Sequence, residues 1–135
     1  MQVILGLDIG EKRIGVAVGD SAVKIASPYG IVAMGDSAVA EIQQLADKLR
    51  VATIVVGLPR NAAGEETRQS AFSRDFAEKL RPLGLPIVLQ DESLTSVMAA
   101  DMLSSQQRSK KHNKQQIDAM AASLILSDYL EANYG

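Results

Sequence analysis

The chain opens with Met1–Asp20, MQVILGLDIGEKRIGVAVGD, and this stretch decides the fold. Residues 3–9 and 13–18 are rich in Val and Ile, and the turn residues Gly10-Glu11-Lys12 separate them, as in two antiparallel strands. Asp8 lies inside the first of these apolar runs. A buried carboxylate without a partner is costly. The stretch therefore predicts a strand pair and, within it, an acid that requires a cationic partner.

The rest of the chain predicts a sheet covered by helices. A third Val- and Ile-rich run at about 25–33 completes an antiparallel meander, because Gly19-Asp20 marks a second turn. Helical and strand periods then alternate, which implies parallel strands joined by right-handed crossovers. The expected elements are a helix at 38–49 capped by Asp36 or Ser37, a strand at 52–59, a helix at 66–81, a strand at 85–92, a helix at 96–103 capped by Ser96, an exposed loop at 104–115, and a helix from about Lys114 to Asn133 with Asn113 and Gln116 as a capping box. The fold class is α/β, with a mixed five-stranded sheet of three meander strands followed by two parallel strands.

Length and composition narrow the classes of protein. The 135 residues suffice for one domain, 1–135, and are too few for two ordinary ones. The absence of cysteine excludes disulfides and thiolate sites, and the single histidine, His112, makes a Ser-His-Asp hydrolase a poor candidate. No apolar run reaches the roughly 18 residues of a membrane span, and there is no signal-peptide pattern. We therefore expect a cytoplasmic protein with no membrane partner.

Acidic residues lie in three predicted elements that are far apart in the chain. Asp8 is in the first strand, Asp91 and Glu92 end the last strand, and Asp118 is in the terminal helix. Asp118 shares its helix face with apolar residues, namely Ala121, Ala122, Ile125 and Tyr129. Like charges on the buried sides of elements cannot all stay ionised without a cation. That cation is either an arginine, for which Arg13 on the neighbouring strand is the candidate, or a metal ion.

A metal ion fits this set of acids better, because one guanidinium cannot satisfy three or four carboxylates. Oxygen ligands without cysteine or an available histidine favour Mg²⁺ or Mn²⁺. Two such ions about 4 Å apart activate a water and stabilise the leaving oxygen in phosphodiester cleavage. The formal net charge of -2 disfavours a polyanionic partner, yet two bound divalent cations would make the protein positive.

Four motifs run in order along nearly the whole chain: LGLDIGEKRIGVA at 5–17, IVVGLPRNAAGE at 54–65, PIVLQDESLTS at 86–96 and IDAMAASLIL at 117–126. In these motifs the chain resembles the YqgF family of ribonuclease H-like proteins, also described as RuvX or as Holliday junction resolvases. The resemblance implies a mixed five-stranded sheet flanked by helices, and a catalytic metal-binding triad at Asp8, Glu92 and Asp118. It also implies maturation of the 5′ end of 16S ribosomal RNA precursors, or cleavage of branched DNA.

Two positions depart from the family pattern. The family usually has D-E-R-L-T where this chain has Asp91-Glu92-Ser93-Leu94-Thr95, so a basic contact beside Glu92 is missing. An Asp is also common before the glycine where this chain has Ala63-Gly64. The metal triad therefore transfers to this chain more directly than the nucleic-acid contacts do.

Basic residues near the proposed site are the candidates for nucleic-acid contacts. Lys12 and Arg13 follow Asp8 at the first turn, and Arg60 is at a strand end, where α/β sheets place ligand loops. The segment before the last helix adds Arg108, Lys110, Lys111 and Lys114, together with His112. Such residues hold backbone phosphates in many complexes. The alternatives are a solvated loop and an ordinary surface arginine.

These residues predict a Mg²⁺- or Mn²⁺-dependent nuclease with two metals at Asp8, Glu92 and Asp118, acting on a ribosomal RNA precursor. The alternative enzyme is a Holliday junction resolvase with the same site, which requires a symmetric dimer for its paired cuts. Two hypotheses of another class are a nucleotide-phosphate-binding module related to actin-like kinases and a non-catalytic nucleic-acid-binding factor. The sequence leaves the oligomeric state between a monomer and a weak homodimer.

Overall fold

The computed structural model describes residues 1–92 and 114–135, without the side chains of residues 114 and 115. The described elements are β1 (Val3–Ile9), β2 (Arg13–Asp20), β3 (Ala26–Ala33), α1 (Ala38–Leu49), β4 (Val51–Leu58), α2 (Arg68–Leu80), the 3₁₀ helix η1 (Arg81–Leu83), β5 (Ile87–Asp91) and α4 (Lys114–Tyr134). The predicted elements that fall within these residues are confirmed, and their ends agree to within two residues. The predicted helix at 96–103 with its Ser96 cap, residues 104–113 of the predicted loop at 104–115 and the Asn113 cap lie outside the described residues. Residues 114 and 115, the end of that predicted loop, instead belong to α4.

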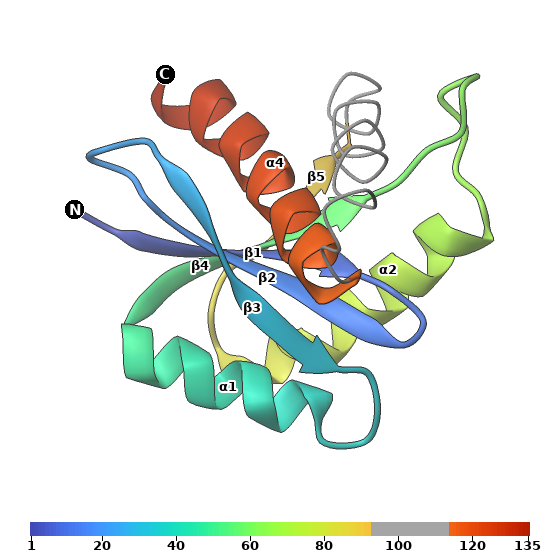
Figure 1. Ribbon diagram of the computed structural model, residues 1–135, viewed down its shortest axis with the longest axis horizontal. Coiled ribbons are helices and arrows are strands. Elements are labelled where there is room, and N and C mark those ends of the chain that lie inside the picture. Colours follow the sequence, from blue (N-terminus) through green and yellow to red (C-terminus); the bar gives the residue numbers. More distant parts are fainter. Residues whose placement is uncertain (93–113) are drawn as a thin grey trace.

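The sheet has the strand order β3-β2-β1-β4-β5. β1 pairs with β2 and β2 with β3 in antiparallel fashion, whereas β4 runs parallel to both β1 and β5. The mixed five-stranded sheet predicted from the sequence is therefore confirmed. Because β1, β4 and β5 run in the same direction, their carboxyl ends lie at one edge of the sheet, which is where such sheets commonly place ligands (Figure 1).

The helices cover both faces of the sheet, with α1 and α2 on one face and α4 across the other (Figure 1). Side chains of a strand alternate between faces, and this alternation separates two cores. Leu5, Leu7 and Ile9 of β1 belong to the core under α1 and α2, while Ile4 belongs to the core under α4. By the same alternation, Asp8 lies on the face covered by α4.

Three glycines, Gly6, Gly15 and Gly19, allow α4 to lie close against β1 and β2. A Cβ atom built on Gly15 would lie 2.0 Å from the backbone oxygen of Asp118. The corresponding atom on Gly6 would lie 2.8 Å from Leu126 Cβ, and that on Gly19 would lie 3.0 Å from a methyl carbon of Leu126. The main chain of Asp118 therefore rests directly on β2.

The buried face of α4 differs in part from the predicted stripe. Ala122, Ile125 and Tyr129 are buried as expected, whereas Ala121 is only half-buried and lies outside both cores. The other buried apolar residues of this helix are Ala119, Leu126 and Leu130. The segment IDAMAASLIL is apolar on nearly all sides, so residue spacing alone does not decide which face is buried.

The predicted cap of α1, Ser37, is present, but its side chain makes a contact that was not predicted. Ser37 is the N-cap of α1, but its hydroxyl donates to the Glu41 carboxylate at 3.2 Å and makes no cap bond. At the start of α2 the Thr67 N–H donates to Ser70 Oγ at 2.8 Å.

None of the helices within residues 1–92 and 114–135 has the length and apolar character of a membrane span.

Candidate active site

Asp8 lies near the carboxyl end of β1, in the centre of the sheet. Its cross-strand neighbour on β2 is Gly15. The side chain is partly buried on the face that α4 covers. Within the described part of the chain, no hydrogen bond or ion pair reaches its carboxylate. The acid that looked anomalous in the sequence therefore has no basic partner of its own here.

Glu92 directly follows β5, and its main chain is tied to the neighbouring strand. The Glu92 N–H donates to the carbonyl oxygen of Leu58 at 3.1 Å. Its carboxylate lies over Gly57, because a Cβ atom built on Gly57 would lie 2.9 Å from Glu92 Oε1 and 2.5 Å from Ile125 Cδ1. The missing side chain at Gly57 thus provides the space for this carboxylate on the face of α4.

Asp118 lies in the second turn of α4, above Gly15. Its Oδ2 accepts a hydrogen bond from Arg13 Nε at 2.8 Å, and the two side chains form an ion pair. Arg13 begins β2, so the pair joins the strand to the helix. Arg13 was proposed from the sequence as the basic partner of the acids, and it is confirmed as the partner of Asp118. Among the described residues it forms no ion pair with Asp8 or Glu92.

Asp8 lies within electrostatic range of both Glu92 and Asp118. Burial first, and then the negative charges of Glu92 and Asp118, raise the pKa of Asp8 from 3.8 to about 7. Burial also raises the pKa of Glu92 above its ordinary value. The fold therefore brings acids from the first strand, the end of the last strand and the terminal helix to one edge of the sheet.

In the protein without metal, Asp8 should make stability depend on pH. Because its pKa is about 7 when folded and 3.8 when unfolded, the folded state binds this proton more tightly. The contribution of Asp8 to the free energy of unfolding is fully favourable below about pH 4 and is lost as the pH rises to about 7. Urea unfolding in EDTA between about pH 5 and about pH 8 should show wild type losing stability relative to Asp8→Asn. A difference that stays constant over this range would contradict the crowding of the acids.

The donor set suits a hard divalent cation. Asp8, Glu92 and Asp118 offer only carboxylate oxygens, the ligands that Mg²⁺ and Mn²⁺ prefer. A cation there would also relieve the repulsion that contributes to the raised pKa of Asp8. As the side chains stand, no three acidic or histidine residues in the described ranges are close enough together to hold a metal ion. One oxygen of the Asp118 carboxylate is engaged by Arg13, which therefore competes with any metal ion for this acid.

The acids that compete with Glu92 for a functional role have partners of their own. The contacts are Asp91 with Arg60 at 3.2 Å, Glu66 with Arg74 at 2.6 and 2.7 Å, and Glu65 with Asn61 at 3.3 Å. Within the described residues, the Glu92 carboxylate accepts no side-chain hydrogen bond. Among the described residues, Glu92 is therefore the one of these acids whose carboxylate has no side-chain partner.

The basic residues proposed as nucleic-acid contacts are in different situations. Lys12 is exposed in the turn after β1, and Arg13 is engaged in the ion pair described above. Arg60 donates to Asp91 and, at 3.1 Å, to the carbonyl oxygen of Gly64, so it fastens the loop after β4 to the end of β5. The remaining candidates lie outside the description: Arg108, Lys110, Lys111 and the side chain of Lys114.

Three residues that shape the site were not predicted from the sequence: Gly15, Gly57 and Gln69. Gln69 Nε2 donates to the carbonyl oxygen of Ile9 at 2.7 Å, which ties the first turn of α2 to the residue after Asp8. The two glycines carried a signal, since a glycine inside a strand often marks the close approach of another backbone or a ligand. Gln69 carried none, because glutamine is an ordinary residue on the surface of a helix.

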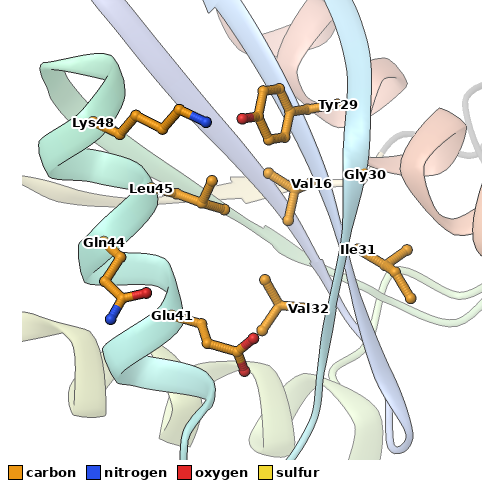
Figure 2. A pocket seen from close by; sticks show the side chains of 9 residues that line it. All are labelled: Val16, Tyr29, Gly30, Ile31, Val32, Glu41, Gln44, Leu45 and Lys48. Atoms are coloured by element: carbon orange, nitrogen blue, oxygen red, sulfur yellow. The ribbon is translucent and has the colours of Figure 1, made fainter.

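A pocket of about 330 Å³ lies between α1 and the edge strand β3. Val16, Val32 and Leu45 form its apolar wall, and Tyr29 and Lys48 point toward each other across it (Figure 2). Val16 and Val32 belong to the core on the side of α1. The pocket is therefore on the opposite face of the sheet from α4, and it is separate from the three acids.

Comparison with known proteins gives a family and close relatives. A family model described as "RuvX: Holliday junction resolvase" matches residues 2–132. The chain is 42% identical over 134 residues to a protein of Chloroflexus aggregans named "Putative pre-16S rRNA nuclease", with 97% of this chain and 94% of that protein covered. A protein of the same name from Geobacillus kaustophilus is 39% identical over 133 residues, with 95% and 96% covered.

Two solved structures share the fold. RuvC of Thermus thermophilus, in complex with a Holliday junction substrate, matches with a TM-score of 0.58 at 15% identity and covers 99% of this chain and 98% of its own. The Holliday junction resolvase of fowlpox virus matches with a TM-score of 0.58 at 13% identity, covering 97% and 99%. At such identities the likeness is one of fold, and it confirms the ribonuclease H-like architecture expected from the motifs. The match over residues 2–132 and the identity to the curated relatives show that this chain belongs to the RuvX family.

Proposed function

We propose that this protein is a divalent-metal-dependent nuclease that hydrolyses phosphodiester bonds in RNA, with the 5′ end of a 16S ribosomal RNA precursor as its cytoplasmic substrate. The observation that carries the proposal is that the buried Asp8 lies within electrostatic range of both Glu92 and Asp118. Burial and the other two charges raise the pKa of Asp8, although only Asp118 has a basic partner among the described residues. Such crowding destabilises the bare fold, and perturbed acids of this kind are concentrated at functional sites.

Asp8, Glu92 and Asp118 are the residues that would hold the metal ions. As proposed from the sequence, their carboxylates would hold two divalent cations. A bound divalent cation supplies charge that polarises the phosphoryl oxygens and lowers the pKa of an attacking water. The chain's own groups position the acids. Strand pairing fixes Asp8 in the centre of the sheet, and the contact with Gly15 fixes the distance of Asp118 from it. No side-chain nucleophile is required, because water attacks.

The nucleic-acid strand is proposed to lie along the carboxyl ends of β1, β4 and β5. Lys12 in the turn after β1 is exposed there, and so is Arg68 in the first turn of α2. The proposal also includes Arg108, Lys110, Lys111 and Lys114 as phosphate contacts, because they precede Asp118 in the chain. Phosphate contacts carry no sequence information, so the preference for RNA rests on the names of the curated relatives.

The experiment that tests the proposal compares wild type with Asp118→Asn in Mn²⁺ on three substrates. These are a 16S precursor with its 5′ leader, an unrelated linear RNA of equal length and a four-way DNA junction. We expect wild type to cleave the precursor within its leader, and Asp118→Asn to lose about 10²-fold in rate or more while it still binds RNA. EDTA should abolish cleavage, and added Mg²⁺ or Mn²⁺ should restore it.

Asp47→Asn is the matched control, because Asp47 is exposed on α1, on the face of the sheet opposite α4. This variant should cleave at the wild-type rate. Paired cuts in the DNA junction, with no cleavage of the precursor, would favour the resolvase alternative and a dimer. RNA binding without cleavage of any substrate would reject the nuclease and leave a non-catalytic binding factor.

A further inference from the structure

The ion pair between Arg13 and Asp118 sets Asp118 apart from the other two acids. Arg13 Nε lies 2.8 Å from Asp118 Oδ2, and the side chains are 27% and 32% exposed. Within the described residues, neither Asp8 nor Glu92 has such a partner. A pair with this exposure stabilises a protein only slightly, so exchanging one cation for another at Asp118 costs little.

The surroundings of Asp118 restrict how its carboxylate can change partner. The Asp118 backbone oxygen would be only 2.0 Å from a Cβ atom on Gly15, so the helix already lies as close to β2 as the main chains allow. The carboxylate can therefore change its position by rotation of its own side chain, without a shift of α4. As placed, the acids in the described ranges do not form a metal-holding group. A cation shared by all three acids would thus need these side chains to rearrange, and Arg13 is the group that competes with it for Asp118.

We propose that Arg13 is exchanged on metal binding: its guanidinium balances Asp118 in the protein without metal, and it is released to a phosphate of the nucleic-acid strand when a divalent cation joins Asp8, Glu92 and Asp118. This inference rests on the proposed function. Arg13 directly follows the turn that carries the exposed Lys12, so the released guanidinium would be adjacent in the chain to a second proposed phosphate contact. A planar guanidinium is suited to both partners, since it binds carboxylate and phosphate with the same geometry.

The first test is the affinity for Mn²⁺ alone, measured by titration calorimetry on the full chain. Arg13→Gln should bind Mn²⁺ about three- to fivefold more tightly than wild type, because the metal no longer competes with an ion pair of modest strength. Arg13→Lys keeps the charge and should stay within about twofold of wild type. The control is Arg81→Gln, which also removes a positive charge and an ion pair, with Glu78, but at the far end of α2. It should bind Mn²⁺ like wild type.

The second test is the salt dependence of RNA binding, with and without Ca²⁺ as a cation that occupies oxygen sites. The probe is a short fluorescein-labelled single-stranded RNA. In wild type, Ca²⁺ should steepen the slope of log affinity against log salt, and in Arg13→Gln this steepening should be smaller by about 0.7, the value of one phosphate contact. Thermal melts of each variant confirm that the fold is intact.

The outcomes separate the exchange from the function on which it rests. If wild type binds no Mn²⁺, or if Asp8→Asn binds it equally well, the proposed metal site itself is rejected. If wild type binds Mn²⁺ but Arg13→Gln binds it equally or more weakly, the exchange is rejected and Arg13 instead holds Asp118 in position. If Arg13→Lys binds like Arg13→Gln, competition by charge is rejected. Tighter Mn²⁺ binding together with the smaller Ca²⁺ effect supports the exchange.

Discussion

Asp8→Asn should abolish cleavage and, at the same time, stabilise the fold in the absence of metal. The change removes a carboxylate ligand, and kcat should fall about 10³-fold or more, as for other groups that act within one catalytic unit. It also removes a negative charge that Glu92 and Asp118 repel. In EDTA at about pH 8, where Asp8 is ionised, the midpoint of thermal unfolding should therefore rise. Single-turnover cleavage in Mn²⁺ and a calorimetric melt in EDTA measure the two effects.

The size of the stabilisation is bounded by the pKa of Asp8. A shift from 3.8 to about 7 corresponds to at most about 4 kcal/mol, and the burial of an unpaired amide offsets part of this gain. Asp47→Asn is again the control, and neither its activity nor its melting point should change. An Asp8→Asn protein that is both inactive and less stable would indicate damage to the fold, and a fully active one would overturn the site.

Gly15→Ala should lower the free energy of unfolding by about 3 kcal/mol or more, because it overpacks a contact between main chains. The new Cβ would lie 2.0 Å from the carbonyl oxygen of Asp118 and 2.4 Å from its carbonyl carbon. A flexible side chain could move aside, but this backbone belongs to a helix that covers a core. α4 must therefore lift from β2 and carry Asp118 away from Asp8, so cleavage should fall along with stability. Urea unfolding and a cleavage assay in Mn²⁺ measure the change.

Gly30→Ala is the matched control for this substitution. Gly30 is also a strand glycine, in β3, but a Cβ atom built there meets nothing within 4 Å. Its free energy of unfolding should stay within about 0.5 kcal/mol of wild type. If Gly15→Ala were as stable and active as Gly30→Ala, the close contact of α4 with β2 would not exist as described.

Local patterns predicted the sheet well, because each strand carries its own signal. The run around Asp8 combines β-branched residues with the turn residues that follow it, and this combination decides strand and hairpin without distant information. The parallel direction of the later strands followed from their alternation with helices, which implies crossover connections. The face of α4 was predicted less well. Ala121 was placed in the core because a helix that is apolar on most sides has no single buried stripe in its sequence.

The residues of the candidate site also differ in how far the sequence alone predicts them. Asp8 and Asp118 were found because an acid on an apolar face is an anomaly that one sequence reveals. The choice of Asp118 as the partner of Arg13 was not predictable, because it depends on where α4 crosses β2. The contact of Arg60 with Asp91 likewise depends on two parallel strands ending side by side. The roles of the glycines depend on the approach of another element, which residue spacing does not contain.

The position of α4 in the chain has a consequence for the timing of activity. This helix follows all five strands, yet it covers one face of the sheet and supplies Asp118. A nascent polypeptide that has emerged from the ribosome only as far as β5 therefore has an uncovered apolar face and two of the three acids. The proposed RNA-cutting centre lacks Asp118 until α4 docks on the sheet, so the part of the chain up to β5 cannot bring all three acids together.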